Sequence, residues 1–277
     1  MSKLVGFLSN NPYLNLSLIL IYGYLIIKLH NPLVQLSIVV MKFTGIDGYN
    51  TLISIITVVC LIFLSVYIWK SYRRNKENWQ EKIIFSGLIM LFLILHYRFL
   101  LEMNIEIIHA FAYGIWFIPL LAFFRSPALA LTVSLPFMLF DEWYQYQVLY
   151  PHYVQYWELN DVILNVLGCM FMMALIKWSD IKISVEWRWS ITLLALYIVL
   201  FSFCVFFGVF AVTKQDVNSN SILIINKLLT FNQWWQIHPL TKKEYLVVGW
   251  KSFWMLISLL ILLNNINFSL ARNYFKK

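Results

Sequence analysis

Eight stretches of mainly apolar residues, each about 20 residues long, constrain this chain more than any other feature. They cover approximately residues 13–29, 51–69, 83–100, 105–124, 127–149, 159–178, 189–212 and 246–266. A helix of that length crosses the hydrocarbon core of a bilayer. Only 12% of the residues are charged, against about 25% in a soluble domain, so a soluble core could not bury this much apolar surface. The sequence therefore predicts an all-α, polytopic integral membrane bundle of about eight transmembrane helices.

Two further apolar segments do not fit a membrane span. The segment PLVQLSIVVMKF (32–43) is too short to cross, and SILIINKLLTFNQWW (221–235) is amphipathic with Trp at its end. We expect both to form short interfacial helices. The chain then divides into N-terminal spans with a basic cytoplasmic loop (1–82), a four-helix core (83–178), and C-terminal spans with an external loop at 213–245 (179–277).

The distribution of basic residues predicts the orientation of the bundle. The loop KSYRRNKENWQEK (70–82) carries five Lys and Arg residues, and loops of this kind stay in the cytoplasm. With alternating spans, both termini are then cytoplasmic, and residues 140–160 lie on the outer side of a plasma (inner) membrane. Because membrane topology accounts for the net charge of +8, we expect the lipid bilayer and not nucleic acid as a partner.

Polar residues recur on one face of the fourth apolar stretch. In EIIHAFAYG, Glu106, His109 and Tyr113 are spaced by three and four residues, so they share a helix face near the outer end. Arg98, just upstream, continues the spacing. A hydrogen-bonded seam between helices is the alternative interpretation, because polar side chains often join membrane helices in this way.

The ends of the next two stretches carry acids and amides. In DEWYQ, Glu142 and Gln145 lie one turn apart, while we interpret Asp141 mainly as a marker of the membrane interface. In NDVILNVLG, Asp161 and Asn165 share a face with a glycine three residues further on. Helix capping is the alternative role at the start of this segment, but it does not account for Asn165, a turn deeper.

The three patterns place ionisable groups at one depth on three consecutive spans. Because short loops make these spans neighbours, we expect their side chains to converge in a pocket open to the outside, and ionisable groups facing a membrane bundle's interior are functional candidates. The candidate catalytic residues are His109, Glu142 and Asp161. The candidate ligand-binding residues are Glu106, Tyr113, Gln145, Asn165 and Arg98.

The order and spacing of these motifs resemble the VanZ-like membrane proteins over about residues 83–178. The usual family form is K-x2-H-f-x-a-Y, then E-x2-Q, then D-x3-N-x2-G. The matching residues here are His109, Phe111, Tyr113, Glu142, Gln145, Asp161, Asn165 and Gly168. Glu106 stands where the family often has Lys, and the loop before Asp161 lacks the family's Arg, which leaves Arg98 as the basic residue nearest the motifs. The resemblance implies a cell-envelope setting, since the family is named for resistance to teicoplanin, and it implies no settled reaction.

Four functional hypotheses follow. The first is a binding or envelope-modulating protein whose pocket recognises an envelope lipid, a lipid-linked wall precursor or a glycopeptide. The second is an intramembrane enzyme in which His109, Glu142 and Asp161 act as acid, base and orienting group, or as ligands of a divalent metal, the one cofactor we consider. The third is a transporter or flippase, with Pro119 and Pro136 breaking helices. The fourth is a scaffold subunit whose aromatic surface contacts partner membrane proteins.

Overall fold

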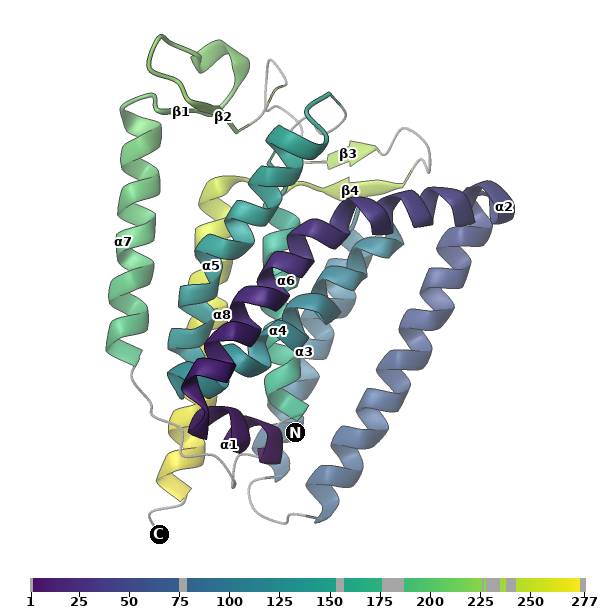
Figure 1. The fold of residues 1–277 in the computed structure, drawn as a ribbon, viewed down its shortest axis with the longest axis vertical. Helices are drawn as coiled ribbons and strands as arrows, with labels where there is room; N and C mark the ends of the chain where they lie inside the picture. The colour runs from purple at the N-terminus through teal and green to yellow at the C-terminus, as the bar shows by residue number, and fades with distance from the viewer. Residues whose placement is uncertain are drawn as a thin grey trace.

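The computed structural model describes residues 2–74, 79–152, 157–175, 187–225, 227, 235–237 and 243–274. Within these ranges the chain is mostly helical (Figure 1). The α-helices are α1 (Ser2–Asn10), α2 (Pro12–Arg74), α3 (Trp79–Phe99), α4 (Ile108–Phe124), α5 (Pro127–Tyr144), α6 (Leu159–Leu175), α7 (Trp187–Phe206) and α8 (Trp250–Tyr274). α4 and α5 run on through Pro119 and Pro136 as single helices.

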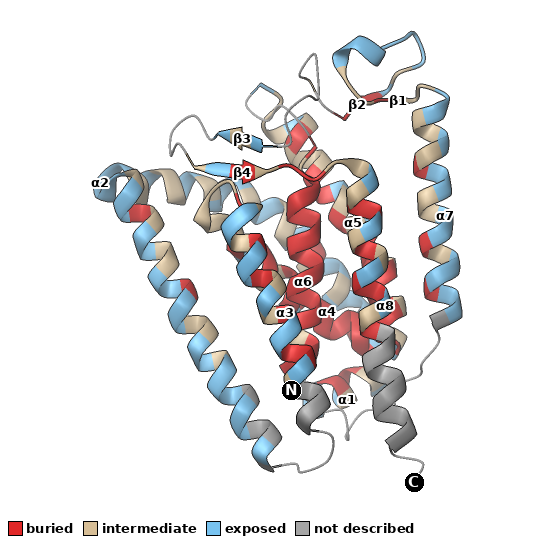
Figure 2. Cartoon of the chain, turned by 180° about the vertical axis from the view of Figure 1, so that it is seen from behind, coloured by how far each residue is buried: buried red, intermediate tan, exposed pale blue. Residues whose placement is uncertain are grey.

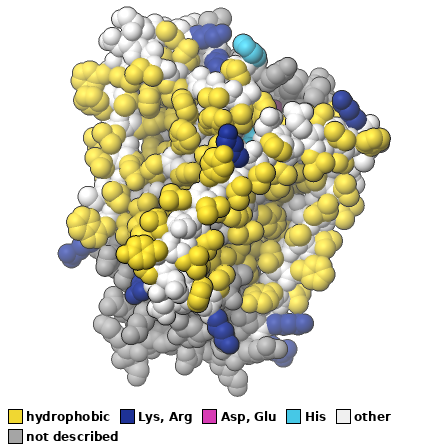
Figure 3. Space-filling model, in the orientation of Figure 1, with side chains coloured by type: hydrophobic (Ala, Val, Ile, Leu, Met, Phe, Trp, Pro, Cys, Tyr) yellow, Lys and Arg dark blue, Asp and Glu magenta, His cyan; other side chains and the backbone are white. Residues whose placement is uncertain are grey.

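Three helical segments in the described part are long and apolar enough to cross a membrane. They are Pro12–Tyr67, Asn104–Phe124 and Arg188–Phe206. The shorter segments Ile83–Phe99, Leu159–Leu175 and Trp250–Asn264 are also apolar. Hydrophobic side chains cover most of the face drawn in Figure 3, and hardly any acidic side chain reaches it. The helical character of the prediction is confirmed, whereas the number of spans stays a prediction.

The helix α2 is 63 residues long and bends sharply at Gly45. Gly45 has φ 73° and ψ 166°, a backbone conformation that favours glycine because it has no Cβ. The predicted spans 13–29 and 51–69 form the two arms on either side of this bend (Figure 1). The separate interfacial helix predicted at 32–43 is wrong in its bounds, because the first arm continues through Pro32 without a helix end.

The helix α6 occupies the centre of the bundle. Nearly all of its residues are buried, and it packs against α3, α4, α5 and α8. Figure 2 shows α6 almost wholly buried, while α7 and the second arm of α2 expose much of their surface. Most buried apolar residues belong to one continuous core around α4 and α6. A helix that is buried on all sides supplies a rigid base for polar groups at its end.

Four strands of two or three residues add a small β component to the mostly helical chain. Phe210–Ala211 (β1) pairs in parallel with Leu223–Ile224 (β2), and Trp235–Ile237 (β3) pairs antiparallel with Glu244–Leu246 (β4). The interfacial helix predicted at 221–235 is therefore wrong where the structure describes that segment, since backbone bonds such as Ile225 N to Ala211 O (2.8 Å) hold it extended. Isoleucine-rich segments such as SILIIN suit a strand when a partner is available. Residues 226 and 228–234 lie outside the described part.

The strands shorten one predicted span and shift the start of another. The span predicted at 189–212 ends at Phe206, and Gly208 follows with φ 69° before β1 begins. The span predicted at 246–266 begins only at Trp250, because β4 takes the residues before it. The strands lie at one end of the bundle, here called the strand end, and the start of α1 and the last turns of α8 lie toward the opposite end (Figure 1).

Candidate functional site

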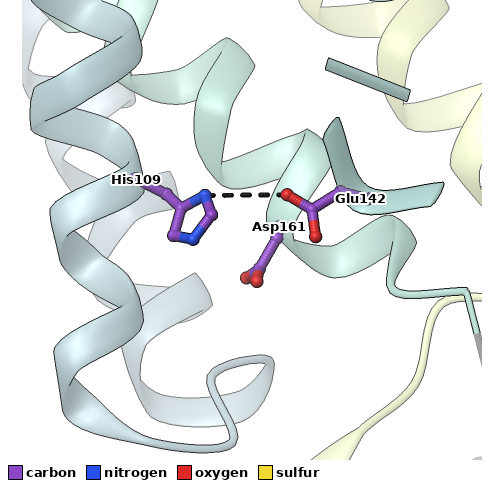
Figure 4. A group of neighbouring side chains, drawn as sticks. All are labelled: His109, Glu142 and Asp161. Atoms are coloured by element: carbon purple, nitrogen blue, oxygen red, sulfur yellow. Dashed lines mark ion pairs between the residues drawn. The ribbon is translucent and has the colours of Figure 1, made fainter. Parts of the chain in front are cut away.

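Three consecutive helices bring an imidazole and two carboxyl groups together. His109 lies in the first turn of α4, Glu142 in the last turn of α5 and Asp161 in the first turn of α6. Each offers a donor atom within 4.8 Å of the other two, and we call the three residues the His–Glu–Asp cluster. His109 Nδ1 is 3.6 Å from Glu142 Oε1, and the three side chains point toward one another (Figure 4). All three are buried, at 8%, 2% and 4% exposure respectively.

The convergence depends on the direction and spacing of the helices. α4 and α5 are joined by only two residues, Arg125 and Ser126, and the Ser126 hydroxyl accepts a hydrogen bond from Leu129 N (3.4 Å) at the start of α5. α5 therefore runs back to the level at which α4 began. A π-helical turn, Gln145–Leu149 (η2), then continues α5 at the strand end before the chain turns into α6.

Small residues allow α6 to approach α4 closely. A Cβ atom on Gly168 would collide with the carbonyl group of Ala110, and one on Gly114 would lie 2.9 Å from Gly168 O. The Cys169 thiol donates to Tyr113 O (3.4 Å) at the same crossing. This close contact between the two helices places Asp161, two turns before Gly168 on α6, beside the start of α4.

Tyr113 acts on the cluster through a neighbouring acid. Its hydroxyl donates to Asp141 Oδ2 at 2.8 Å, and both side chains are almost completely buried. The interpretation of Asp141 as a marker of the interface is wrong, because this residue is only 1% exposed and lies next to Glu142. Tyr113 therefore positions an acid beside the cluster, a role that its spacing from His109 did not reveal.

Several buried polar atoms around the cluster have no hydrogen-bond partner in the described part of the chain. They are Asp141 Oδ1, Glu142 Oε1, Gln145 Nε2, and both Oδ1 and Nδ2 of Asn165. Buried polar atoms in folded proteins nearly always have a partner, whether protein, water or ion. Asn165, which the sequence singled out, has both amide atoms unpartnered inside the described part of the bundle, while Glu142 Oε1 faces only His109 Nδ1 at 3.6 Å. This pattern is typical of a site that accepts a ligand.

Glu106 has a structural role that the sequence did not indicate. Its two carboxylate oxygens accept hydrogen bonds from Glu102 N (2.8 Å) and Met103 N (2.6 Å), which caps the 3-10 turn Asn104–Ile107 (η1) before α4. Arg98 is exposed and lies over the ring of Phe99 at 5.3 Å. No ion pair joins Arg98 to an acid among the described residues, so the structure does not bring it into the cluster.

Acidic side chains outnumber basic ones around the cluster. Burial and the neighbouring acids Asp161, Glu102 and Glu106 raise the pKa of Glu158 well above its usual value. Lys243 interacts electrostatically with Glu106 and Glu102, and its Nζ donates to Tyr97 O at 3.3 Å. Burial lowers the pKa of Lys243, against the opposing effect of Glu106. A cation is the ligand that these crowded acids favour, because a nearby positive charge stabilises their ionised form.

Two residues near the cluster could not be found from local spacing. The His30 ring, on the first arm of α2, lies 5.7 Å from the His109 ring and 5.9 Å from the Tyr150 ring, measured between centroids. Asn160 donates to Leu100 O (3.0 Å) and Leu246 O (2.8 Å), and its Oδ1 accepts from Val248 N (2.9 Å). Helix capping, the alternative role at the start of this segment, is not what Asn160 does: its side chain ties the start of α6 to the residue after α3, to β4 and to the segment before α8. In both cases the residues in contact are far apart in the sequence, so no local spacing connects them.

The donor set of the His–Glu–Asp cluster suits a divalent cation. One imidazole nitrogen and two carboxylate oxygens are ligands found together at zinc sites and at sites of other first-row transition metals. With His109 neutral and both acids ionised, the set carries a charge of −2, which a divalent ion neutralises. Comparison with family models, curated proteins and solved structures found no match to this chain.

Proposed function

We propose that this chain is an integral membrane protein that binds a divalent cation at the His–Glu–Asp cluster and, through the cation, the anionic head group of a cell-envelope lipid or lipid-linked wall precursor. The proposal is carried by one observation: His109, Glu142 and Asp161 come from three helices, and their donor atoms lie within 4.8 Å of one another in a buried setting. Burying two carboxylates without a counter-ion costs several kcal/mol for each ion, and a divalent cation removes that cost.

The spacing of the donor atoms is close to that of a coordinated ion. Two ligands 2.0–2.2 Å from zinc at a tetrahedral angle lie about 3.4 Å apart. The distance of 3.6 Å between His109 Nδ1 and Glu142 Oε1 already matches this value. Small side-chain rotations bring the remaining donors, within 4.8 Å, to the same separation.

The cation also accounts for recognition of an anion by an acidic site. The ionised carboxylates of Glu142 and Asp161 would repel a phosphate group in the absence of a metal. A bound divalent cation reverses the local charge and offers open coordination positions to phosphate oxygens. The free amide groups of Gln145 and Asn165 then provide hydrogen bonds to the same head group.

The membrane setting is supported by the three long apolar helices and by the shorter apolar helices beside them. We propose eight spans, with both termini and the basic loop at 70–82 in the cytoplasm and the strand end outside. The arrangement in Figure 1, with the start of α1 and the last turns of α8 toward the end opposite the strands, supports this orientation. The VanZ-like order of motifs supports a cell-envelope role.

A metal-dependent hydrolase of the same ligand is the second candidate. Catalytic zinc sites have three protein ligands and leave a fourth position for water, and the cluster supplies three donors. Asp141 and Glu158 are additional acids near the cluster that could move a proton. Release of head group from a labelled envelope lipid distinguishes this candidate from a protein that binds only.

The test compares cation binding by purified protein and matched variants. Protein in mild detergent is stripped with chelator, and its affinity for Zn²⁺ and Mn²⁺ is measured by calorimetry. We expect one site in the unmodified protein and a loss of at least about tenfold in affinity for E142Q and D161N. The control is E244Q on β4, an exposed acid outside the cluster. Equal affinity in all four proteins, with each one eluting as a single folded species, would overturn the proposal.

A further inference from the structure

A second histidine faces the cluster from a helix that is far away in sequence. The rings of His30 and His109 meet edge to face, with centroids 5.7 Å apart and planes at 61°. His30 lies on the first arm of α2, which packs along α4. Neither ring nitrogen of His30 has a hydrogen-bond partner among the described residues. The ring therefore has a free donor nitrogen beside the cluster.

We infer that His30 is a fourth ligand residue, so that α2 completes the cation site formed by α4, α5 and α6. The inference rests on the proposed function, because it assigns a further donor to the same cation. It extends the site from the four-helix core to the N-terminal part of the chain. The site then has two imidazole nitrogens and two carboxylate oxygens.

The separation of the two rings fits a shared ion. When two imidazoles bind one zinc ion through nitrogens 2.0–2.1 Å from the metal, their ring centroids lie about 5 Å apart at a tetrahedral angle. The observed 5.7 Å is about half an ångström longer, a difference that one small rotation of the His30 side chain removes. The His30 ring is therefore within reach of an ion held by His109.

The first arm of α2 is held firmly enough to position a ligand. Trp116 Nε1 on α4 donates to Ile19 O at 2.9 Å, one face of the arm packs at Gly23 against the Phe137 ring, and the Tyr150 hydroxyl lies 3.3 Å from Asn31 Oδ1. These contacts fix the arm two and three turns before His30 and immediately after it. The Tyr150 ring also packs against the His30 ring, with centroids 5.9 Å apart, which limits the orientations available to the imidazole.

A fourth donor has a chemical consequence. Two nitrogen and two oxygen ligands favour zinc and similar transition metals over magnesium or calcium, which prefer oxygen alone. The charge of the ligand set stays at −2, so a divalent ion is still neutralised. Selectivity for zinc over magnesium should therefore depend on His30.

The number of imidazoles bound to the metal tests the inference directly. Full-length protein in detergent is loaded with one equivalent of Zn²⁺, and zinc K-edge X-ray absorption counts imidazoles by their multiple scattering. We expect two zinc-bound imidazoles in the unmodified protein, one in H30Q and one in H109Q. The control H152Q changes an exposed histidine and should leave the count at two. Zinc affinity should fall at least about tenfold in H30Q and recover in part in H30D, which restores a donor.

The outcomes separate this inference from the proposed function. Tight zinc binding with one imidazole in both the unmodified protein and H30Q overturns the assignment of His30 and leaves the three-residue site standing. Zinc binding that is absent, or unaffected by E142Q and D161N, overturns the proposed function and the inference with it. If H30Q does not fold, H30D supplies the same comparison, because an oxygen donor at this position also lowers the imidazole count to one.

Discussion

Gly168 on α6 and Ala110 on α4 lie so close that a Cβ atom on the glycine would overlap the alanine carbonyl group. This contact sets the distance between the helix that carries His109 and the helix that carries Asp161. The cluster thus depends on a backbone approach that lies next to His109 on α4 and two turns after Asp161 on α6. Predictions for the bundle and for the site follow from this dependence.

Replacing Gly168 with alanine should disturb both stability and cation binding. The added methyl group must push α4 and α6 apart, and overpacking of this kind costs about 1–3 kcal/mol. We expect a lower unfolding temperature in detergent and weaker zinc binding. The matched control is G87A on α3, where an added Cβ meets nothing within 4 Å. A G168A protein as stable as G87A would contradict the described crossing.

Replacing Tyr113 with phenylalanine should destabilise the protein without removing a cluster residue. The change leaves Asp141 Oδ2 without its hydrogen bond inside the bundle, which costs about 1–3 kcal/mol. Chemical unfolding followed by tryptophan fluorescence measures the loss. Y13F, on a tyrosine that is 87% exposed, should have no effect. Equal losses in the two variants would show that the bond from Tyr113 to Asp141 contributes nothing to stability.

The pH dependence of stability should report on Glu158. Its pKa is raised in the folded protein by burial and by Asp161, Glu102 and Glu106. The folded state therefore holds this proton more tightly than the unfolded state, and the associated stability is lost as pH rises through the raised value. E158Q, which cannot ionise, should be more stable than the unmodified protein at neutral pH, and the difference should vanish below the usual pKa of a glutamate. Unfolding measured across this pH range, with E244Q as control, checks the sign.

The Asn160 side chain should contribute more to the free energy of unfolding than the exposed side chain of Asn11 does. N160A leaves two carbonyl groups and the Val248 N–H without partners at the point where three segments meet, which should cost about 2 kcal/mol or more. N11A removes one exposed local bond to Phe7 O and serves as the comparison. Proteolysis between β4 and α8 should also become faster in N160A. An N160A protein with the stability of N11A would show that these three bonds are dispensable.

The cluster could be predicted from the sequence because its three members depend on local rules. His109, Glu142 and Asp161 lie at the ends of successive helices joined by short connections, so helix periodicity and span alternation place them at one depth. The roles of Tyr113, Asp141 and Glu106 could not be predicted in the same way. Each depends on the direction of a hydrogen bond, which spacing alone does not determine.

Contacts between distant segments account for the other differences. His30 is 79 positions before His109, and no periodic pattern connects a residue on α2 with one on α4. The strand at Leu223–Ile224 forms because β1 offers it a partner, whereas its sequence in isolation is equally typical of an amphipathic helix. The first arm of α2 is continuous because the helix accommodates Pro32. The sequence prediction divided the chain there because segment 32–43 is too short to cross a membrane.

The burial of α6 on all sides has a consequence for biosynthesis. The ribosome completes α1 to α5 before it reaches Leu159, so the two acids at the end of α5 emerge before the helix that packs around them. Until α6 arrives, Asp141 and Glu142 lack the helix that buries them, and α3, α4 and α5 lack their main packing partner. The insertion machinery or a chaperone must shield this intermediate, and a chain truncated before α6 should be degraded rather than accumulate as a smaller stable bundle.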